Sequence, residues 1–253
     1  MIDTRLQTVT ANQSYPLLLM TLSGAHLYGF PSADSDYDLR GVHILPVQEV
    51  VGLHEGRETI ETTIMQDGLE IDLVTYDVKK FFVLLLKKNG SVLEQIYSPL
   101  VIHTTPGHEE LKLIARKCIT CHHHHHYFGF AESQWKLFSK ESSHQVKPLL
   151  YIYRVLLTGI HLMRTGEVES NLLRLNEVFK LSYIPELIAR KLSGPEHAVL
   201  EAADLSFHRG EYERLRGELE QSAQTSVLPT EPSSDAKKAL NALLIQLRLR
   251  QQQ

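Results

Sequence analysis

Short apolar and alternating stretches fill the first 105 residues of the chain. The run YPLLLMTL is apolar almost throughout and ends at a Ser-Gly pair, a pattern typical of a buried strand. The stretch DYDLRGVHI alternates between polar and apolar residues. Two later stretches are rich in Ile, Val and Thr and flank Asp67-Gly68, which is a hairpin signal. The pattern predicts strands over residues 15–22, 36–44, 59–64 and 69–76, with one helical turn inside the turn at residues 24–33.

The hydrophobic period changes at Asp77. The stretch DVKKFFVLLLKKNG predicts a helix that Asp77 caps and Gly90 ends. A second short helix is expected over residues 92–97, and Pro99 ends it. Residues 100–105 have the composition of an added edge strand.

From about residue 107 onward the patterns are almost exclusively helical. Because strands dominate the first part and helices the rest, we expect an α+β protein of two domains, residues 1–105 and residues 106–253. A segment rich in Ser, Thr and Pro, residues 222–235, predicts a flexible linker before a last amphipathic helix over residues 236–250.

Composition and charge change this picture little. Hydrophobic residues make up 43% of the chain and charged residues 22%, and the formal net charge is −4. These values are ordinary for a globular protein and exclude a global basic field for nucleic acid, though not a local basic groove. The first residues lack a signal-peptide core, and two cysteines cannot staple a chain of this size. We expect a reduced, cytoplasmic protein without a membrane span.

The candidate chemistry lies in the stretch SGAHLYGFPSADSDYDLRG, which ends in an acidic cluster of Asp34, Asp36 and Asp38. Asp36 and Asp38 are two apart on a predicted strand, so their side chains leave the same face, with Cβ atoms about 6–7 Å apart. Such a pair repels unless a cation lies between the carboxylates, and oxygen ligands suit Mg²⁺. The preceding glycine turn can present N–H groups to phosphate. The alternative is a solvated acidic turn.

This stretch resembles the signature of the DNA polymerase β-type nucleotidyltransferase superfamily, and its fuller string is similar to a bacterial and phage branch that includes RlaP-type proteins. The resemblance implies a mixed sheet with helices, followed by an all-helical C-terminal domain. It also implies that Gly24 and Gly29 are the two turn glycines and that Asp36 and Asp38 are metal ligands. In the family a serine follows the first glycine and holds the terminal phosphates. Here Ala25 takes its place, so Ser23, His26 or backbone N–H groups would compensate.

The family places a third acid on a neighbouring strand, where it binds the catalytic metal and helps to activate the attacking hydroxyl. In LEIDLVTY we assign this role to Asp72, which lies between two apolar residues on the polar strand face, with Glu70 in reserve. The alternative is an exposed acid on a one-sided sheet. Arg40 shares the face of Asp36 and Asp38 and is expected to be their partner or a phosphate contact, or else a surface salt bridge.

A very apolar helix is expected over residues 147–165, with Gly166 as its stop. Such a helix should be buried on most sides, so its one polar stripe would line a cleft. The resemblance implies cationic contacts to the triphosphate or the base from such a domain, which suits Lys147 and Arg154, with Tyr151 stacking on a base. The alternative is an ordinary solvated stripe. The stripe consists of Lys147, Tyr151, Arg154, Thr158, His161 and Thr165.

The segment CITCHHHHHYFGF contains five consecutive histidines. On a helix, Cys118, Cys121, His122 and His125 would share one face and make a soft-metal site geometrically possible. A zinc finger is not supported, because the second ligand pair is missing. We favour histidines that line the cleft as donors to phosphate or base, with the others solvated. Trp135 is expected to be a packing anchor, with base stacking as the alternative.

These patterns and the resemblance predict a metal-dependent nucleotidyltransferase. It would move a nucleoside monophosphate from a nucleoside triphosphate such as ATP to an acceptor hydroxyl, release pyrophosphate, and use Mg²⁺ or Mn²⁺. The acceptors left open are an RNA end, a small hydroxylated molecule and a protein side chain, as in AMP-transferring toxin–antitoxin relatives. Ala25 motivates a further alternative, a weak or inactive nucleotide-binding or sensing module.

Overall fold

The computed structural model describes residues 3–33, 35–141, 144–193, 200 and 202–250, so Asp34 lies outside the described residues. The chain forms two compact units. The first unit contains the sheet and comprises Met1–Leu27, Asp36–Ile119 and Glu231–Gln253. The second unit is helical and comprises Tyr28–Ser35 and Thr120–Thr230. The predicted boundary after residue 105 stays a prediction. The helices Pro106–Arg116 and Ser234–Arg250, which precede and follow the second unit in the sequence, belong to the first unit.

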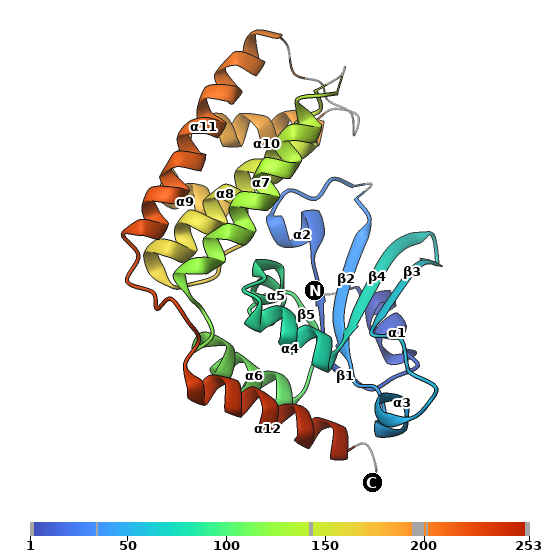
Figure 1. Ribbon diagram of the computed structural model, residues 1–253. Coiled ribbons are helices and arrows are strands. Elements are labelled where there is room, and N and C mark those ends of the chain that lie inside the picture. Colours follow the sequence, from blue (N-terminus) through green and yellow to red (C-terminus); the bar gives the residue numbers. More distant parts are fainter. Residues whose placement is uncertain (1–2, 34, 142–143, 194–199, 201, 251–253) are drawn as a thin grey trace. The chain divides into compact units, whose positions relative to one another are not determined.

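A mixed five-stranded sheet forms the first unit, in the order β3-β4-β2-β1-β5 (Figure 1). β2 and β4 are parallel neighbours, and every other neighbouring pair is antiparallel. Asp38 on β2 therefore lies in register with Asp72 on β4. The strands are β1 (Leu17–Leu22), β2 (Tyr37–His43), β3 (Thr59–Gln66), β4 (Leu69–Asp77) and β5 (Val101–Thr104).

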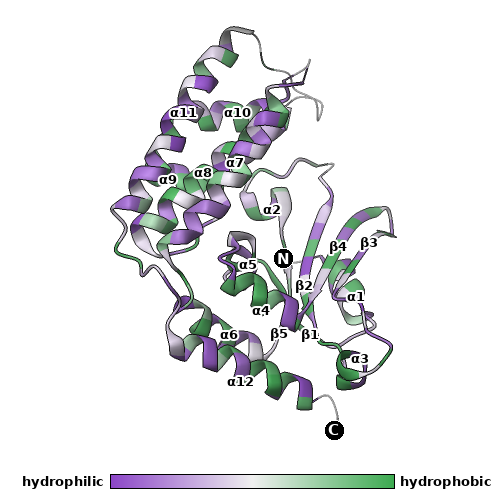
Figure 2. Ribbon diagram, viewed as in Figure 1, coloured by the Kyte–Doolittle hydropathy of each residue, from purple (hydrophilic) through white to green (hydrophobic). Residues whose placement is uncertain are grey.

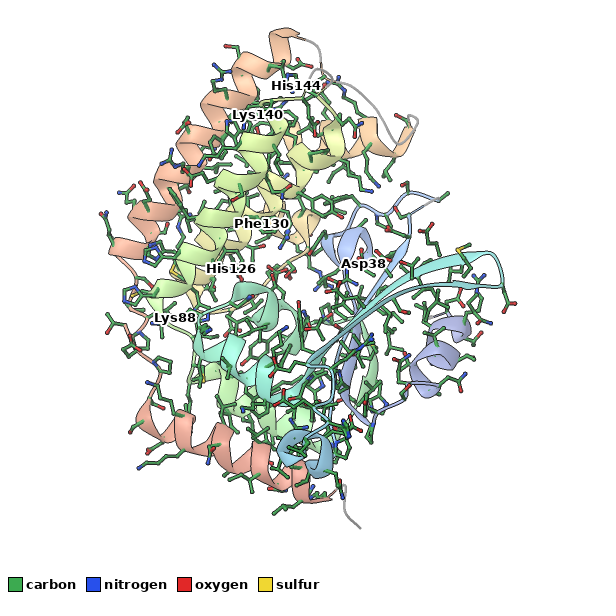
Figure 3. The ribbon with its side chains drawn as sticks, turned by 45° about the vertical axis from the view of Figure 1, so that its right-hand side comes forward. Asp38, Lys88, His126, Phe130, Lys140 and His144 are labelled. Carbon is green, nitrogen blue, oxygen red and sulfur yellow. The ribbon has the colours of Figure 1, made fainter. Side chains whose placement is uncertain are left out.

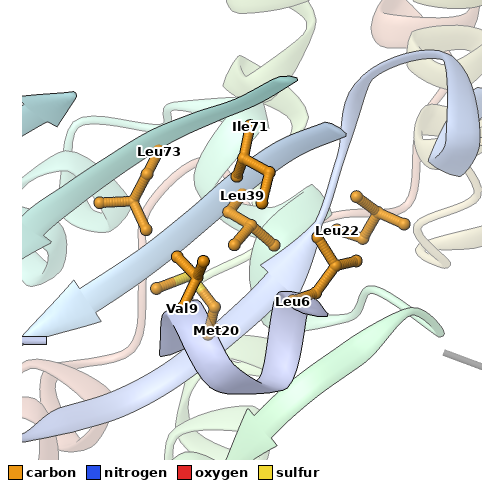
Figure 4. Close-up of a cluster of buried hydrophobic side chains, with 7 residues drawn as sticks. All are labelled: Leu6, Val9, Met20, Leu22, Leu39, Ile71 and Leu73. Atoms are coloured by element: carbon orange, nitrogen blue, oxygen red, sulfur yellow. The ribbon is translucent and has the colours of Figure 1, made fainter. Parts of the chain in front are cut away.

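One face of the sheet is sealed by α1 (Thr4–Ala11), whose Leu6 and Val9 pack onto side chains of the central strands (Figure 4). Leu39 and Ile71 belong to this core and are fully buried. Hydrophobic and hydrophilic residues alternate along the first part of β4 (Figure 2), so Glu70 and Asp72 project from the face opposite to that of Ile71 and Leu73. That opposite face carries the candidate carboxylates.

Further helices of the first unit pack around the strands. α4 contacts β2 and β4, α6 contacts β1, and α12 contacts both of these helices. Arg248 fastens α12, because its guanidinium bonds the carboxylate of Asp77 at 2.5 Å and the carbonyl of Leu45 at 2.6 Å. The bounds are α3 (Val47–Val51), α4 (Val78–Leu86), α5 (Gly90–Ile96), α6 (Pro106–Arg116) and α12 (Ser234–Arg250).

The second unit is a bundle around α8 (Val146–Thr165), which contacts four other helices and is buried over most of its surface. Gly166 ends α8 with φ 73°, as expected for a left-handed cap. Residues 225–233 follow the long helix without helix or strand, and the predicted flexibility of this segment stays a prediction. The remaining elements are η1 (Cys121–His123), α7 (His124–Phe138), α9 (Leu172–Phe179), α10 (Tyr183–Ser193) and α11 (Ala202–Gln224).

The α+β class, the predicted strands and the cap at Asp77 are confirmed, since its carboxylate accepts a hydrogen bond from Lys79 N. The helix stop at Gly90 is wrong. The helix ends at Leu86, Asn89 caps the next helix and Gly90 is its first residue. The glycine alone indicated a helix stop, but the side chain of Asn89 caps the N-terminus of a new helix that begins at Gly90.

Candidate functional site

The carboxylate of Asp38 lies directly against the backbone of Gly24. A Cβ atom added at Gly24 would come within 1.8 Å of Asp38 Oδ2, and Gly24 has φ +60°. The chain segments are also joined by a hydrogen bond of 2.8 Å from Ser23 N to the carbonyl of Asp38. Position 24 therefore requires glycine for two reasons: its φ is positive, and a Cβ atom would occupy the space of the Asp38 carboxylate.

Asp38, which is labelled in Figure 3, is held by Arg40, two residues further along β2. Arg40 Nη2 lies 2.5 Å from Asp38 Oδ1, and Arg40 Nη1 donates to the carbonyl of Asp72 at 2.8 Å. The Arg40 side chain is 25% exposed and that of Asp38 is 18% exposed, so solvent screens the pair only in part. Arg40 thus bridges the two strands and orients the carboxylate of Asp38. Its role toward a nucleotide stays a prediction.

Asp72 lies on the same sheet face as Asp38, because the two residues are partners in a parallel register. Thr63 on the edge strand β3 donates to Asp72 Oδ1 at 2.8 Å, a contact that the sequence did not indicate. Glu70 lies on the same face and is exposed. Asp36 stands just before β2 and is half-buried. Whether Asp36 shares a metal with Asp38 stays a prediction.

The donor set of this site fits a hard divalent cation. Asp36, Asp38 and Asp72 supply only oxygen ligands, which Mg²⁺ and Mn²⁺ prefer, and Gly24 leaves open the place that Asp38 takes beside the turn. In the part of the chain that the structure describes, a group of histidines, and not these carboxylates, brings its ligand atoms within 4.8 Å of one another. Joint binding of one ion would therefore require the carboxylates to change rotamer and Arg40 to share Asp38.

The side chain of His26 in the glycine turn faces away from this carboxylate. The His26 ring stacks on the Tyr37 ring at a centroid distance of 4.3 Å, and Tyr37 packs on the α1 side of the sheet. Successive strand residues alternate in side, so His26 and Asp38 lie on opposite faces. His26 lines a cavity of about 530 Å³ there, with Leu6 among its neighbours. Ala25 is 3% exposed. Nucleotide binding by Ser23, Ala25 and His26 stays a prediction.

In the second unit, two of the predicted contact residues meet the part of the glycine turn around Gly29. The Arg154 guanidinium lies 3.9 Å from the centre of the Tyr28 ring, which is within cation–π range. Tyr28 and Phe30 both present edge-on contacts to Tyr151, at 5.3 Å and 5.7 Å between ring centroids. Arg154 is only 3% exposed, so the alternative of a solvated stripe is wrong at the middle of α8. Lys147 is half-buried.

The same segment is anchored by residues that the sequence analysis missed. Lys191 is buried, and its ammonium donates to the carbonyl of Phe30 and to Ser32 Oγ, each at 2.9 Å. Gly29 has φ +89°, and a Cβ there would come within 2.5 Å of Asn171 Oδ1. No local pattern around Lys191 or Asn171 indicates such contacts. The nucleotide-binding roles of Gly29, Lys147, Tyr151 and Arg154 stay predictions.

The prediction that Cys118, Cys121, His122 and His125 share one helical face is wrong. α6 ends at Arg116, Cys118 lies in the turn that follows, and η1 begins at Cys121. Burial raises the pKa of the Cys118 thiol to about 11, which makes it a poor thiolate ligand. Trp135 stacks on Tyr212 at 4.3 Å with the ring planes 5° apart, as expected for a packing anchor.

Replacing Gly24 by alanine is expected to disable the site without unfolding the protein. The added Cβ displaces the Asp38 carboxylate, and the positive φ adds a strain of roughly 1–2 kcal/mol. Gly68→Ala is the matched control, because Gly68 has φ +78° and open space around an added Cβ. We expect the nucleotidyl transfer that the resemblance implies to fall at least about tenfold more in Gly24→Ala than in Gly68→Ala, at similar Tm. Equal activities of the two variants would contradict the contact.

Comparisons with known proteins give a family match and relatives of similar sequence. A family model described as RlaP, RNA repair pathway DNA polymerase beta family, matches residues 1–246. An uncharacterized protein of Methanocaldococcus jannaschii is 35% identical over 156 residues, which cover 61% of this chain and 63% of the relative. The uncharacterized protein YcgL of Bacillus subtilis is 24% identical over 148 residues, 58% of this chain and 56% of the relative. The matches thus span less than two thirds of either relative.

Among solved structures, a nucleotidyltransferase-like protein from Exiguobacterium sibiricum aligns with a TM-score of 0.33 and 14% identity. The alignment covers 88% of this chain and 75% of the other. Within the described residues, none of the helices combines the length and apolar character that crossing a membrane requires.

Proposed function

The chain belongs to the RlaP family, the RNA repair pathway DNA polymerase beta family, and from this premise we propose that it is a metal-dependent nucleotidyltransferase. It transfers a nucleoside monophosphate from a nucleoside triphosphate to an acceptor hydroxyl and releases pyrophosphate. The observation that carries this proposal is the contact between Asp38 and Gly24, which sets a carboxylate of the central strand β2 against the backbone turn that follows β1. A structural acidic turn has no need of that contact.

The reaction is an in-line displacement at the α-phosphorus. The acceptor oxygen forms a bond to this phosphorus, the bond to the oxygen that bridges to the β-phosphorus breaks, and pyrophosphate leaves with the electron pair. Asp72 takes or orients the hydroxyl proton. Asp36, Asp38 and Asp72 would hold Mg²⁺ or Mn²⁺, which would supply positive charge that offsets the charge of the phosphates. Arg40 keeps Asp38 in one orientation through its ion pair.

The chain's remaining candidate groups bind and orient the nucleotide. Ser23 and the backbone N–H groups from Gly24 onward offer donors to the terminal phosphates, in place of the hydroxyl that Ala25 lacks. Lys147 and Arg154 offer positive charge, and Tyr151 offers an aromatic ring for the base. Catalysis of this type depends on positioning and on charge neutralisation rather than on a covalent intermediate.

For the acceptor, we propose an RNA end with a free hydroxyl. The support is the family description, which names an RNA repair pathway. A net charge of −4 gives the chain no global attraction to RNA, so binding would depend on a local basic surface. A small hydroxylated molecule and a protein side chain are the other acceptors that the reaction chemistry allows.

Incubation with Mg²⁺, α-labelled nucleoside triphosphates and an RNA with a free 3′ hydroxyl is expected to label the RNA. Pyrophosphate should appear in equal amount, because one is released per transfer. Chelation of the metal should stop both, since the phosphates then lack their counter-charge. The control substrate is the same RNA with a blocked 3′ end, which should remain unlabelled.

The outcomes of this assay separate the proposals. Pyrophosphate release with label on a polyol or a protein would reject the RNA acceptor and keep the transferase. Tight nucleotide binding without pyrophosphate release would reject the transferase and favour a sensing module. The reason to consider such a module is the buried Ala25, which lacks the hydroxyl of the family's serine.

A further inference from the structure

Three of the consecutive histidines form a cluster at the junction of η1 and α7. One ring nitrogen from each of His122, His124 and His125 lies within 4.8 Å of the others. The rings of His122 and His125 are nearly parallel, with planes 8° apart and centroids at 5.8 Å. The rings of His124 and His125 are closer still, at 3.8 Å. All three side chains are at least partly accessible to solvent.

The other two histidines of the run serve packing. His123 is fully buried, and its Nδ1 accepts a hydrogen bond from Thr120 N in a capping box. The His126 ring packs edge-on against Tyr127, and burial lowers the pKa of His126 to about 4. At the change from 3₁₀-helix to α-helix, the rings of His123 and His126 thus pack inward, and the other three histidines form the cluster.

His124 is oriented in the way that metal-ligating histidines are. Its Nδ1 lies 2.7 Å from the carbonyl oxygen of Cys121, which can only accept a hydrogen bond. Nδ1 therefore carries the proton, and in the neutral ring Nε2 keeps its lone pair for an external electrophile. Such a hydrogen bond from the second nitrogen fixes the tautomer and raises the basicity of the ligating one.

We propose that His122, His124 and His125 form a binding site for a borderline divalent metal ion of the zinc type. Imidazole nitrogens suit Zn²⁺, Cu²⁺ and Ni²⁺, whereas Mg²⁺ prefers oxygen. Three protein ligands leave a fourth tetrahedral position for water or for a group from a bound molecule. The site lies wholly within the second unit and joins the end of η1 to the first turn of α7. It is separate from the carboxylate site and does not rest on the proposed reaction.

The test uses the full chain, stripped of metal with a chelator that is then removed. Zn²⁺ is titrated in competition with a chromophoric chelator, and Co²⁺ is added separately as a spectroscopic probe. We expect one tight equivalent of Zn²⁺ per chain, a Tm raised by several degrees in excess Zn²⁺, and Co²⁺ absorption of the intense, tetrahedral kind. Mg²⁺ should not compete with Zn²⁺ for this site, because it prefers oxygen ligands.

Two variants and one control locate the ion. His124→Gln and His125→Gln should each weaken Zn²⁺ binding by about 10- to 100-fold and abolish the Tm shift. His54→Gln is the control, because His54 is exposed and lies outside the cluster, in the first unit. Should a variant misfold, the Co²⁺ spectrum of the unmodified chain still reports the ligand number. Unchanged Zn²⁺ affinity in both variants, or octahedral Co²⁺ absorption, would overturn the proposal.

Discussion

Asp38→Asn will reduce nucleotidyl transfer by roughly a hundred- to a thousandfold while leaving the protein folded. Asparagine has nearly the same shape as aspartate, so it still fits the space that Gly24 leaves open. It lacks the negative charge that would bind the proposed divalent ion and that pairs with Arg40 at 2.5 Å. The loss should therefore fall on kcat/KM, measured as pyrophosphate release at several Mg²⁺ concentrations, with little change in Tm.

Asp67→Asn is the matched control for this substitution. Asp67 is exposed in the turn between β3 and β4, on the same sheet, and asparagine tolerates its positive φ of 49°. We expect this variant to keep activity within about twofold, since a surface substitution of this kind changes little. Activity of Asp38→Asn within tenfold of the unmodified chain would show that the chemistry lies elsewhere.

Arg248→Met will lower the free energy of unfolding of the first unit by about 3–5 kcal/mol. The Arg248 and Asp77 side chains are only 9% and 3% exposed, and their ion pair has an N–O distance of 2.5 Å. Methionine fills a similar volume but leaves the Asp77 carboxylate buried with only the backbone donors of Lys79 and Leu45. An uncompensated buried charge is the costly outcome, more than the lost attraction itself.

Urea denaturation followed by circular dichroism measures this loss. Fluorescence is unsuitable, because the single tryptophan, Trp135, lies in the second unit. Lys112→Met is the control: Lys112 pairs with Glu109 on the surface of α6, and its loss should cost at most about 1 kcal/mol. In the double variant Asp77→Asn/Arg248→Met we expect a smaller loss than the sum of the single losses. A loss below about 1 kcal/mol in Arg248→Met would contradict a buried pair.

Local patterns predicted much of the fold. Alternation along LEIDLVTY assigned Ile71 to the core and Asp72 to the opposite face, and both assignments agree with the structure. The shift from strand period to helix period at Asp77 also held. Two short helices, α1 and α3, were missed. The sequence of α1 is mostly polar, and only Leu6 and Val9 of this helix belong to the core cluster. Packing on the sheet therefore stabilises α1, and no clear apolar period indicates it in the sequence.

The sequence alone predicted the chemistry of the candidate site, because closely spaced glycines and carboxylates indicate which atoms can contact phosphate or a metal ion. The pairing of those atoms was not, because it depends on which strands become neighbours. Only the parallel pairing of β2 with β4 brings Asp72 beside Asp38 and lets Arg40 reach across. Likewise Lys191 reaches Phe30 across 161 positions of sequence, and Arg248 reaches Asp77 across 171. Residue type and local period are properties of neighbouring positions, whereas such contacts arise when distant segments share one buried core, and no short stretch of sequence encodes its distant partner.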